Sequence, residues 1–234
     1  MAKEVRKIKR EDTLEFILNI HYAKRVPQII HSYGLFEDNN LKGVVTFGNP
    51  PSQNVCKCIC GDIYKSEVLE LNRLVLKDNK KNYASFLVSN SIKNLPKPSI
   101  IVSYADLNYN HNGYIYQASN FIYTGKAKAR EKFVDKNGKD INERTLAHKY
   151  QKLKISRSEY LKLNNIELTT QLGKHRYVYI HASKKDRKQR FRDFKLPIKT
   201  YPKGDNINYF WNYNIKEQGL LFWKNKQQKK KKSI

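Results

Sequence analysis

The sequence lacks the features that define several common protein classes. Its three cysteines all lie within residues 56–60, so they cannot form a long-range disulfide framework, and a reducing compartment is expected. No segment approaches the roughly 20 consecutive apolar residues that a membrane span needs. The charged opening, residues 1–12, has no apolar core of the kind that a signal peptide carries. We therefore expect an intracellular protein without membrane attachment.

Several nucleotide-binding and metalloprotease motifs are also absent. The chain contains no G-x-x-x-x-G-K-[ST], no G-x-G-x-x-G and no H-E-x-x-H pattern. These motifs supply phosphate-binding backbone amides or a zinc ligand pair. Their absence removes the common nucleotide-hydrolase, dinucleotide-binding and zinc-protease interpretations.

Acidic residues are scarce. The chain has 21 Asp and Glu against 46 Lys and Arg, a formal net charge of +25. The excess lies in the second half, because residues 1–124 carry 16 basic and 11 acidic side chains whereas residues 125–234 carry 30 and 10. A charge this large predicts a polyanionic partner, with nucleic acid the leading candidate.

The hydrophobic pattern predicts an α/β fold with a partly parallel sheet flanked by helices. We expect, in order, helix 12–21, an antiparallel hairpin within 32–48, one or two strands within 56–76, helix 79–95, strand 99–106, a short helix within 111–120, strand 121–125, a short helix after Ser156, and strand 175–182 joining the main sheet.

We interpret the chain as a single domain with extensions. Residues 1–11 form a basic N-terminal arm and residues 12–203 the domain, within which residues 126–152 are a polar insertion. Residues 204–234 form a basic C-terminal segment that ends in a lysine-rich tail, predicted to be disordered because it has no means of packing.

The cysteine run C-x-C-x-C is interpreted as part of a strand. Alternation would place Cys56, Cys58 and Cys60 on one face, where thiols pack as small apolar groups. Zinc is the less favoured alternative, because zinc sites pair C-x₂₋₄-C elements with further ligands that the sequence does not supply.

Three polar groups interrupt the apolar pattern. Asp106 ends a predicted central strand, on the side where open α/β sheets place ligands, and His111 and several tyrosines follow it. It could instead cap the following turn. His21 and Tyr22 end the first helix, where they could serve a metal or proton transfer. Arg73 suits a phosphate or carboxylate, or a structural bridge to Glu70.

Seven ordered segments give the sequence a family resemblance. They are HYAKRVP (21–27), YGLFEDNNLKGVVTFGNPPS (33–52), ELNRLVL (70–76), NYASFLVSNSIKNL (82–95), IVSYAD (101–106), HNGYIYQASNFIYTG (111–125) and YPKGDN (201–206). In these segments the chain resembles the Mom family of bacteriophage DNA-modification proteins.

The resemblance implies a fold and an activity. The fold is a core related to the GNAT acyltransferases. The activity is transfer of a carbamoylmethyl group to the exocyclic N6 amine of adenine in double-stranded phage DNA, which protects that DNA from host restriction. The expected location is the host cell cytoplasm.

The resemblance also implies site residues. It predicts iron (Fe²⁺) near His21, Tyr22 and Asp106, and it maps an arginine to Arg73 and a tyrosine to Tyr116. The family's serine falls on Ser85 or Ser91. DNA phosphates are expected on a basic cluster consisting of Lys184, Lys185, Arg187, Lys188, Arg190 and Arg192.

The donor of the transferred group stays open. A GNAT enzyme binds the CoA pyrophosphate with a glycine-rich turn, whereas residues 76–85 (LKDNKKNYAS) contain no glycine. CoA is therefore doubtful as the donor, because glycine lets backbone amides approach a pyrophosphate closely. Two alternatives stand beside DNA modification: a CoA-dependent acyltransferase acting on another substrate, and a basic DNA-binding protein without catalysis. The oligomeric state is not predicted, and a homodimer is one alternative.

Overall fold

The computed structural model describes residues 3–78, 80–109, 111–138, 140–141 and 143–203. The lysine-rich tail that the sequence predicts to be disordered lies outside these residues. Residues 1–199 form one compact unit. Among the described residues, no helix has both the length and the apolar character needed to cross a membrane.

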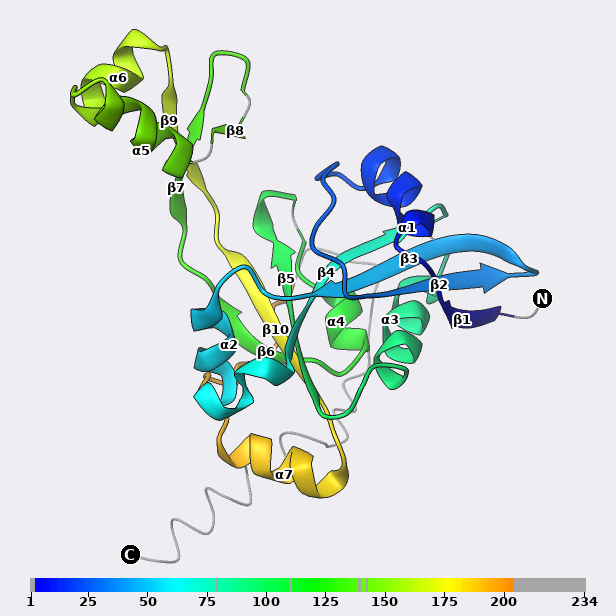
Figure 1. The fold of residues 1–234 in the computed structure, drawn as a ribbon. Helices are drawn as coiled ribbons and strands as arrows, with labels where there is room; N and C mark the ends of the chain where they lie inside the picture. Colours follow the sequence, from blue (N-terminus) through cyan, green and yellow to red (C-terminus); the bar gives the residue numbers. More distant parts are fainter. Residues whose placement is uncertain (1–2, 79, 110, 139, 142, 204–234) are drawn as a thin grey trace, which may run out of the picture. The chain divides into compact units, whose positions relative to one another are not determined.

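The elements follow one another as Figure 1 labels them, with short helical turns where noted. They are β1 Lys3–Lys7, α1 Glu11–Glu15, a π-helical turn Phe16–Ile20, β2 His31–Glu37, β3 Asn40–Gly48, α2 Gln53–Cys60, a 3₁₀ turn Asp62–Glu67, β4 Val68–Leu76, α3 Tyr83–Lys93, β5 Ser99–Asp106, a 3₁₀ turn Leu107–Tyr109, α4 Tyr114–Ala118, β6 Ile122–Lys126, β7 Arg130–Val134, β8 Asp140–Ile141, α5 Glu143–Lys152, α6 Arg157–Leu163, β9 Glu167–Gln171, β10 Lys174–His181 and α7 Lys184–Arg192.

A seven-stranded mixed sheet organises the unit. Its strand order is β1-β2-β3-β4-β5-β10-β6, and every neighbouring pair is antiparallel except β4 with β5. All but one residue of β5 are buried, so helices and loops cover both of its faces. The predicted fold class, a mixed α/β sheet flanked by helices, is confirmed.

The ends of the predicted domain differ from expectation. Part of the segment interpreted as an N-terminal arm is the edge strand β1, which pairs with β2 from Lys3 to Lys7. The polar insertion is longer than residues 126–152. Strands β8, β7 and β9 form a second sheet of three strands, and β9 reaches Gln171. Phe133, Leu146 and Tyr160 give this part a core of its own.

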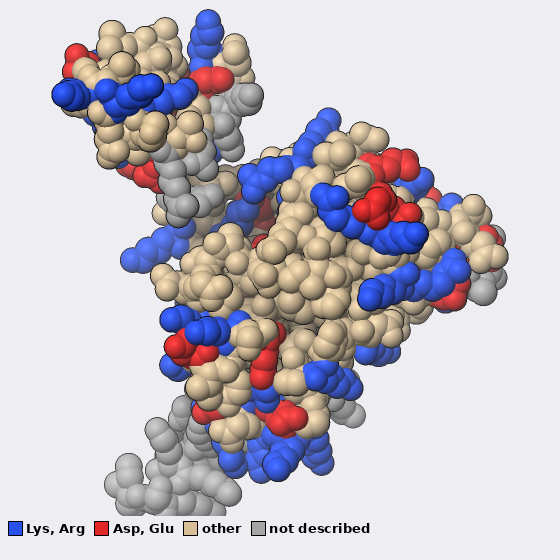
Figure 2. Space-filling model, viewed as in Figure 1, with Lys and Arg blue, Asp and Glu red and all other residues tan. Residues whose placement is uncertain are grey.

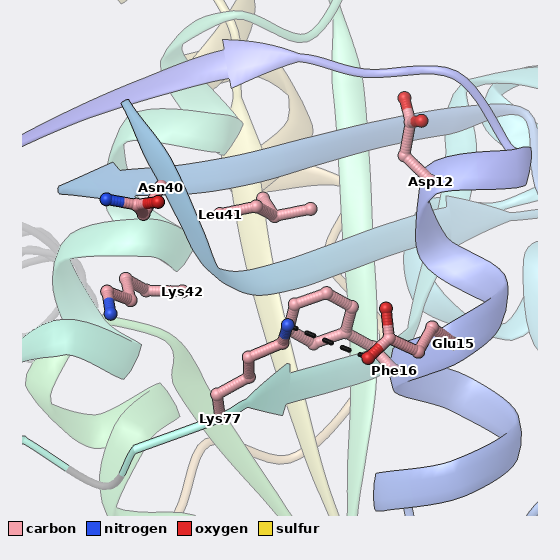
Figure 3. Close-up of a pocket in the computed structure, with 7 residues that line it drawn as sticks. All are labelled: Asp12, Glu15, Phe16, Asn40, Leu41, Lys42 and Lys77. Atoms are coloured by element: carbon pink, nitrogen blue, oxygen red, sulfur yellow. Dashed lines mark ion pairs between the residues drawn. The ribbon is translucent and has the colours of Figure 1, made fainter. Parts of the chain in front are cut away.

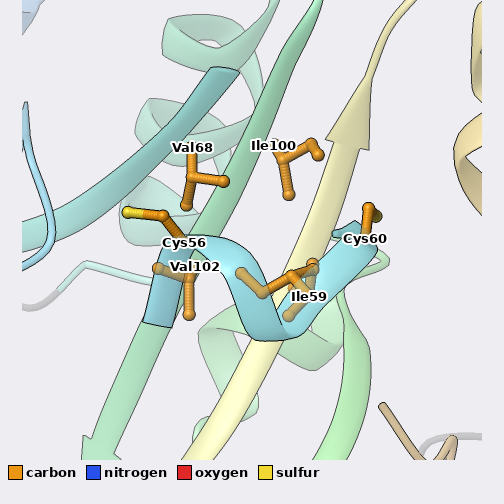
Figure 4. Close-up of a cluster of buried hydrophobic side chains, with 7 residues drawn as sticks. Cys56, Ile59, Cys60, Val68, Ile100 and Val102 are labelled. Atoms are coloured by element: carbon orange, nitrogen blue, oxygen red, sulfur yellow. The ribbon is translucent and has the colours of Figure 1, made fainter. Parts of the chain in front are cut away.

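The three cysteines lie on helix α2 and not on a strand. Figure 4 shows Cys56, Ile59 and Cys60 packed against Val68, Ile100 and Val102 of the main sheet. Cys56 and Cys60 are four residues apart and share the buried face of the helix, while Cys58 is half-buried.

Burial raises the pKa of two of these thiols, Cys56 and Cys60. It raises the pKa of Cys60 to about 12, so this thiol stays protonated at neutral pH. The cysteines thus pack as small apolar groups, as predicted, but the spacing that places them against the sheet is that of a helix and not that of a strand.

Helix α7 is held by an ion pair that the sequence did not reveal. Arg190 is 6% exposed, and its guanidinium donates to both carboxylate oxygens of Glu67, with Nε 2.6 Å from Oε2. Arg190 also donates to the Asp186 carbonyl oxygen at 3.1 Å and lies over the Tyr64 ring. The prediction that Arg190 contacts DNA is therefore wrong, because its side chain is buried and occupied.

We predict that Arg190→Ala lowers the free energy of unfolding by about 3–5 kcal/mol, because it leaves the half-buried Glu67 carboxylate without its partner. Lys188→Ala is the matched control on the exposed face of the same helix and should change it by less than about 0.5 kcal/mol. Urea unfolding measures both. Equal stabilities for the two variants would contradict the structural role given to Arg190.

Candidate active site

The candidate site lies where the only parallel strand pair of the described sheet separates. Strand β4 pairs with β5 only through Val68–Glu70 of β4 and Ile100–Val102 of β5. Beyond these residues β4 continues beside β3, and β5 continues beside β10. The Ser103 hydroxyl donates to the Leu71 carbonyl oxygen at 2.9 Å just beyond the last paired residues. Ligands of α/β sheets bind at the carboxyl ends of such parallel strands.

Six polar side chains from distant segments lie near one another beside the separated strand ends. We call them the polar cluster: His21, Tyr22, Glu70, Arg73, Asp106 and Lys174. The first two follow the π-helical turn, the next two belong to β4, and the last two end β5 and begin β10. The structure thus brings together four of the residues to which the family resemblance points, His21, Tyr22, Arg73 and Asp106.

A hydrogen-bonded tether sets the position of the His21–Tyr22 segment. Arg73 Nη2 donates to the Arg25 carbonyl oxygen at 2.8 Å, and Asn72 Nδ2 donates to the Gln28 carbonyl oxygen at 2.8 Å. Arg73 also donates to the Asn72 carbonyl oxygen at 2.6 Å. Arg73 therefore ties the segment to β4 and makes no ion pair with Glu70 in the described part of the chain.

Asp106 is a buried carboxylate with two partners. Lys174 Nζ lies 2.8 Å from Oδ2, and Asn108 donates to Oδ1 through its backbone N–H at 3.0 Å and its Nδ2 at 2.8 Å. Burial acts to raise the pKa of Asp106, but these hydrogen bonds outweigh it and hold the pKa below its ordinary value. Asp106 is ionised at neutral pH.

The histidine and tyrosines of the site are uncharged. Burial, aided by Arg73 and His111, lowers the pKa of His21 to about 4. Burial and the Asp106 carboxylate raise the pKa of Tyr22. Burial likewise raises the pKa of Tyr116 to about 12, with Tyr22 and Glu70 adding to the effect.

The residues do not fit the iron site that the resemblance implied. His21 Nδ1 accepts the Ala23 N–H at 3.0 Å, so the neutral ring carries its proton on Nε2 and has no lone pair left for a metal. A metal-bound histidine normally donates its second nitrogen's proton. The Lys174 ammonium occupies the cation position beside Asp106. Within the described part of the chain, no three His, Cys, Asp or Glu side chains gather as metal ligands.

Other predicted site residues lie outside the polar cluster. The Ser85 hydroxyl donates to the Asn82 carbonyl oxygen, and Ser91 is fully buried in α3. Neither hydroxyl contacts a described residue of the cluster.

On α7, the exposed basic side chains are those of Lys184, Lys185, Lys188 and Arg192. Figure 2 shows basic side chains gathered there at the lower edge of the view. Arg187 is half-buried beside the rings of Tyr179 and Phe191.

Sequence reasoning missed Lys174 and Asn108. Lys174 begins β10, a strand that was predicted, but its pairing with Asp106 depends on β10 lying next to β5. A separate pocket has a volume of about 390 Å³. Figure 3 shows residues that line it between the first helix and the β2–β3 hairpin, among them Glu15, Phe16 and Lys77. None of its lining residues belongs to the polar cluster, so we assign it no chemistry.

Comparisons with known proteins place the chain in a family. The model of the Mom protein family matches residues 2–203, so the chain belongs to the Mom family. One relative is the methylcarbamoylase Mom of Escherichia phage Mu, 28% identical over 191 residues that cover 78% of this chain and 76% of the relative.

Solved structures of acetyltransferases are similar to this chain at low identity. A GNAT-family acetyltransferase of Bacillus cereus is 15% identical, with a TM-score of 0.40, over 78% of this chain and all of that one. NAA60 of Arabidopsis thaliana, solved in complex with acetyl-CoA, is 16% identical, with a TM-score of 0.46, over 76% of this chain and 98% of that one.

Glu70 supplies a test of the site's electrostatics. Burial raises its pKa, and the attraction of Arg73 and Lys174 offsets only part of this. The folded state therefore binds more protons than the unfolded state above about pH 4.5, so Glu70 destabilises the fold increasingly as pH rises to its folded pKa.

We predict that Glu70→Gln raises Tm at pH 7.5 and leaves it unchanged near pH 4. In a domain of this size, a rise of about 2–4 °C corresponds to about 1 kcal/mol. Thermal unfolding across this pH range measures the effect. A Tm that falls at pH 7.5 would show that Glu70 stabilises the polar cluster as an ion-pair partner.

Proposed function

We propose that this protein is a transferase that modifies adenine in DNA at the polar cluster. The observation that carries the proposal is the meeting of His21, Tyr22, Arg73 and Asp106, which lie far apart in the sequence, at the opening of the sheet. Membership of the Mom family and the name of the phage Mu relative, a methylcarbamoylase, support it.

The transferred group on this proposal is carbamoylmethyl. A bond forms between adenine N6 and the methylene carbon as the bond from that carbon to its donor breaks. The rest of the donor leaves with the electron pair of the broken bond, and N6 loses one proton to solvent. Asp106 is ionised, and its oxygens have lone pairs left beyond those that bind Lys174 and Asn108. Asp106 is thus suited to accept a hydrogen bond from the amine, while Tyr116 and His21 keep donor protons at neutral pH. Protection of phage DNA from host restriction would follow from the modification.

DNA binding is assigned to a different surface. The exposed lysines of α7 can contact phosphates without reading the sequence, and the polar cluster then acts on a base that has left the duplex stack. The proposed partner is therefore double-stranded DNA, and binding and chemistry should be separable by mutation.

We predict that Asp106→Asn abolishes the formation of modified deoxyadenosine while DNA affinity changes less than twofold, because the substitution removes a carboxylate and leaves the α7 lysines intact. Mass spectrometry of nucleosides from DNA co-expressed with each variant measures the modification. Full modification by Asp106→Asn would exclude Asp106 from the reaction. No modified nucleoside with the unaltered protein would contradict the proposed function itself.

We predict that replacing Lys184, Lys185 and Lys188 with Gln flattens the dependence of log affinity on log salt by about 0.9 for each phosphate that the variant no longer neutralises. The control replaces Lys57, Lys65 and Lys93, which removes the same charge. Lys57 and Lys65 already form ion pairs with Asp62, so their charges are less available to bind a phosphate. Binding titrations at several salt concentrations measure the slopes. The same slope for the two triple variants would exclude α7 as the phosphate-binding surface.

A further inference from the structure

An exposed row of aromatic rings borders the polar cluster. The His21 and Tyr22 rings stack with centroids 4.3 Å apart, and the Tyr109 ring follows with its centroid 4.2 Å from that of Tyr22. We call these three rings the aromatic stack. His111 flanks it, with its ring edge-on to Tyr22 at 5.7 Å.

Two rings of the stack are exposed to solvent. Tyr22 is 45% exposed and Tyr109 is 51% exposed, although a tyrosine ring buries a large apolar area when it packs. Tyr22 contacts the rings of both His21 and Tyr109, and the His111 ring centroid lies 6.0 Å from that of Tyr109. About half of Tyr109 stays exposed beside these neighbours.

The turn that carries Tyr109 is fixed on both sides by Asn108. This residue donates to Asp106 Oδ1, and its own Oδ1 accepts the Leu172 N–H at 3.2 Å. The His111 N–H donates to the Asp106 carbonyl oxygen at 3.1 Å. The same buried aspartate that belongs to the polar cluster therefore holds the exposed ring in place.

The other tyrosines near the site are packed. Tyr104 lies against the buried face of α2, and Tyr116 contacts the rings of Phe121 and Tyr177. Among the described tyrosines between β4 and β6, Tyr109 has the largest exposed fraction. It is therefore the tyrosine of this region that offers a ring face to a ligand.

We propose that the exposed ring surface of Tyr109 is the stacking platform for an unpaired purine base of DNA. A base placed there would continue the row of rings beside the polar cluster, which holds the groups suited to its amine. Stacking on an aromatic ring suits every base because each has a π face, and the net charge of +25 favours a polyanionic strand as the ligand. This inference deepens the proposed function and rests on it for the identity of the base as adenine.

The neutral state of the stack favours a base over a phosphate. His21 is uncharged at neutral pH, and Tyr22 remains a phenol. Two of the three rings thus offer apolar faces without a full charge. The third, Tyr109, is held by backbone and amide hydrogen bonds of its neighbour. Such a platform is preorganised, which reduces the entropy lost when a base stacks on it.

The test uses single-stranded oligonucleotides that carry 2-aminopurine, whose fluorescence is quenched when the base stacks on an aromatic ring. Single strands remove the step of extruding a base from a duplex. We expect Tyr109→Leu to weaken binding by about 5- to 150-fold, the range for one base–aromatic stack, and to reduce the quenching. Tyr109→Phe and Tyr109→Trp should bind and quench like the unaltered protein, because they keep the ring.

Phe86→Leu is the matched control, since Phe86 is an exposed aromatic residue on α3 outside the polar cluster and the aromatic stack. It should leave binding and quenching unchanged. Tyr109→Gln is a second ring-deleting variant, and thermal unfolding confirms that each variant is folded. Unchanged binding and quenching in the folded ring-deleting variants would overturn the inference.

Nucleoside mass spectrometry on the same variants separates the inference from the proposed function. Loss of quenching in Tyr109→Leu without any modified adenine from the unaltered protein would retain the platform and reject the proposed activity. The opposite outcome is that the unaltered protein and Tyr109→Leu form equal amounts of modified adenine and quench equally. That result would retain the proposed activity and reject the platform.

Discussion

Strands β4 and β5 share backbone pairing only from Val68 to Glu70 and from Ile100 to Val102, and each then continues beside a different neighbour. Because their carboxyl ends are no longer paired to each other, side chains can occupy the space between them. The Ser103 hydroxyl donates to the Leu71 carbonyl oxygen at the point of separation, and Arg73 and Asp106 follow on the two strands. The candidate site depends on this limited pairing.

The charges at this opening are nearly balanced, which distinguishes it from the rest of a strongly basic chain. Asp106 is matched by Lys174, while Arg73 donates to backbone carbonyls beside a Glu70 whose charge is disfavoured by burial. His21 and the tyrosines are neutral. An opening of this kind suits a neutral heterocycle, whereas the exposed lysines of α7 suit phosphates. The proposed function requires such a division, with the DNA backbone on one surface and a base on another.

Most strands of the main sheet were predictable because alternation and β-branched residues indicate them locally, and the sequence also placed Asp106 at the end of a central strand. The edge strand β1 and the polar strands β7, β8 and β9 lack this pattern and were not predicted. The helical position of Cys56, Cys58 and Cys60 was not predictable, since five residues are too few to separate a period of 2 from one of 3.6.

Partners distant in sequence were also beyond prediction. Arg190 looks like any other cation in a basic segment until Glu67, 123 residues away, is placed beside it. The pairing of Lys174 with Asp106 likewise follows from strand order. The family resemblance pointed to the segments that meet in the polar cluster, but the hydrogen bonds of His21 and Asp106, visible only in three dimensions, removed support for iron.

The central claim is that a DNA base enters at the separated ends of β4 and β5. Photo-crosslinking with an oligonucleotide that carries 8-azidoadenine, followed by peptide mapping, tests it most directly. The structure predicts crosslinks to peptides that contain residues 21–25 and 104–111, the segments that border the opening. Crosslinks confined to α7 or to residues 130–171, with none at these two segments, would contradict it.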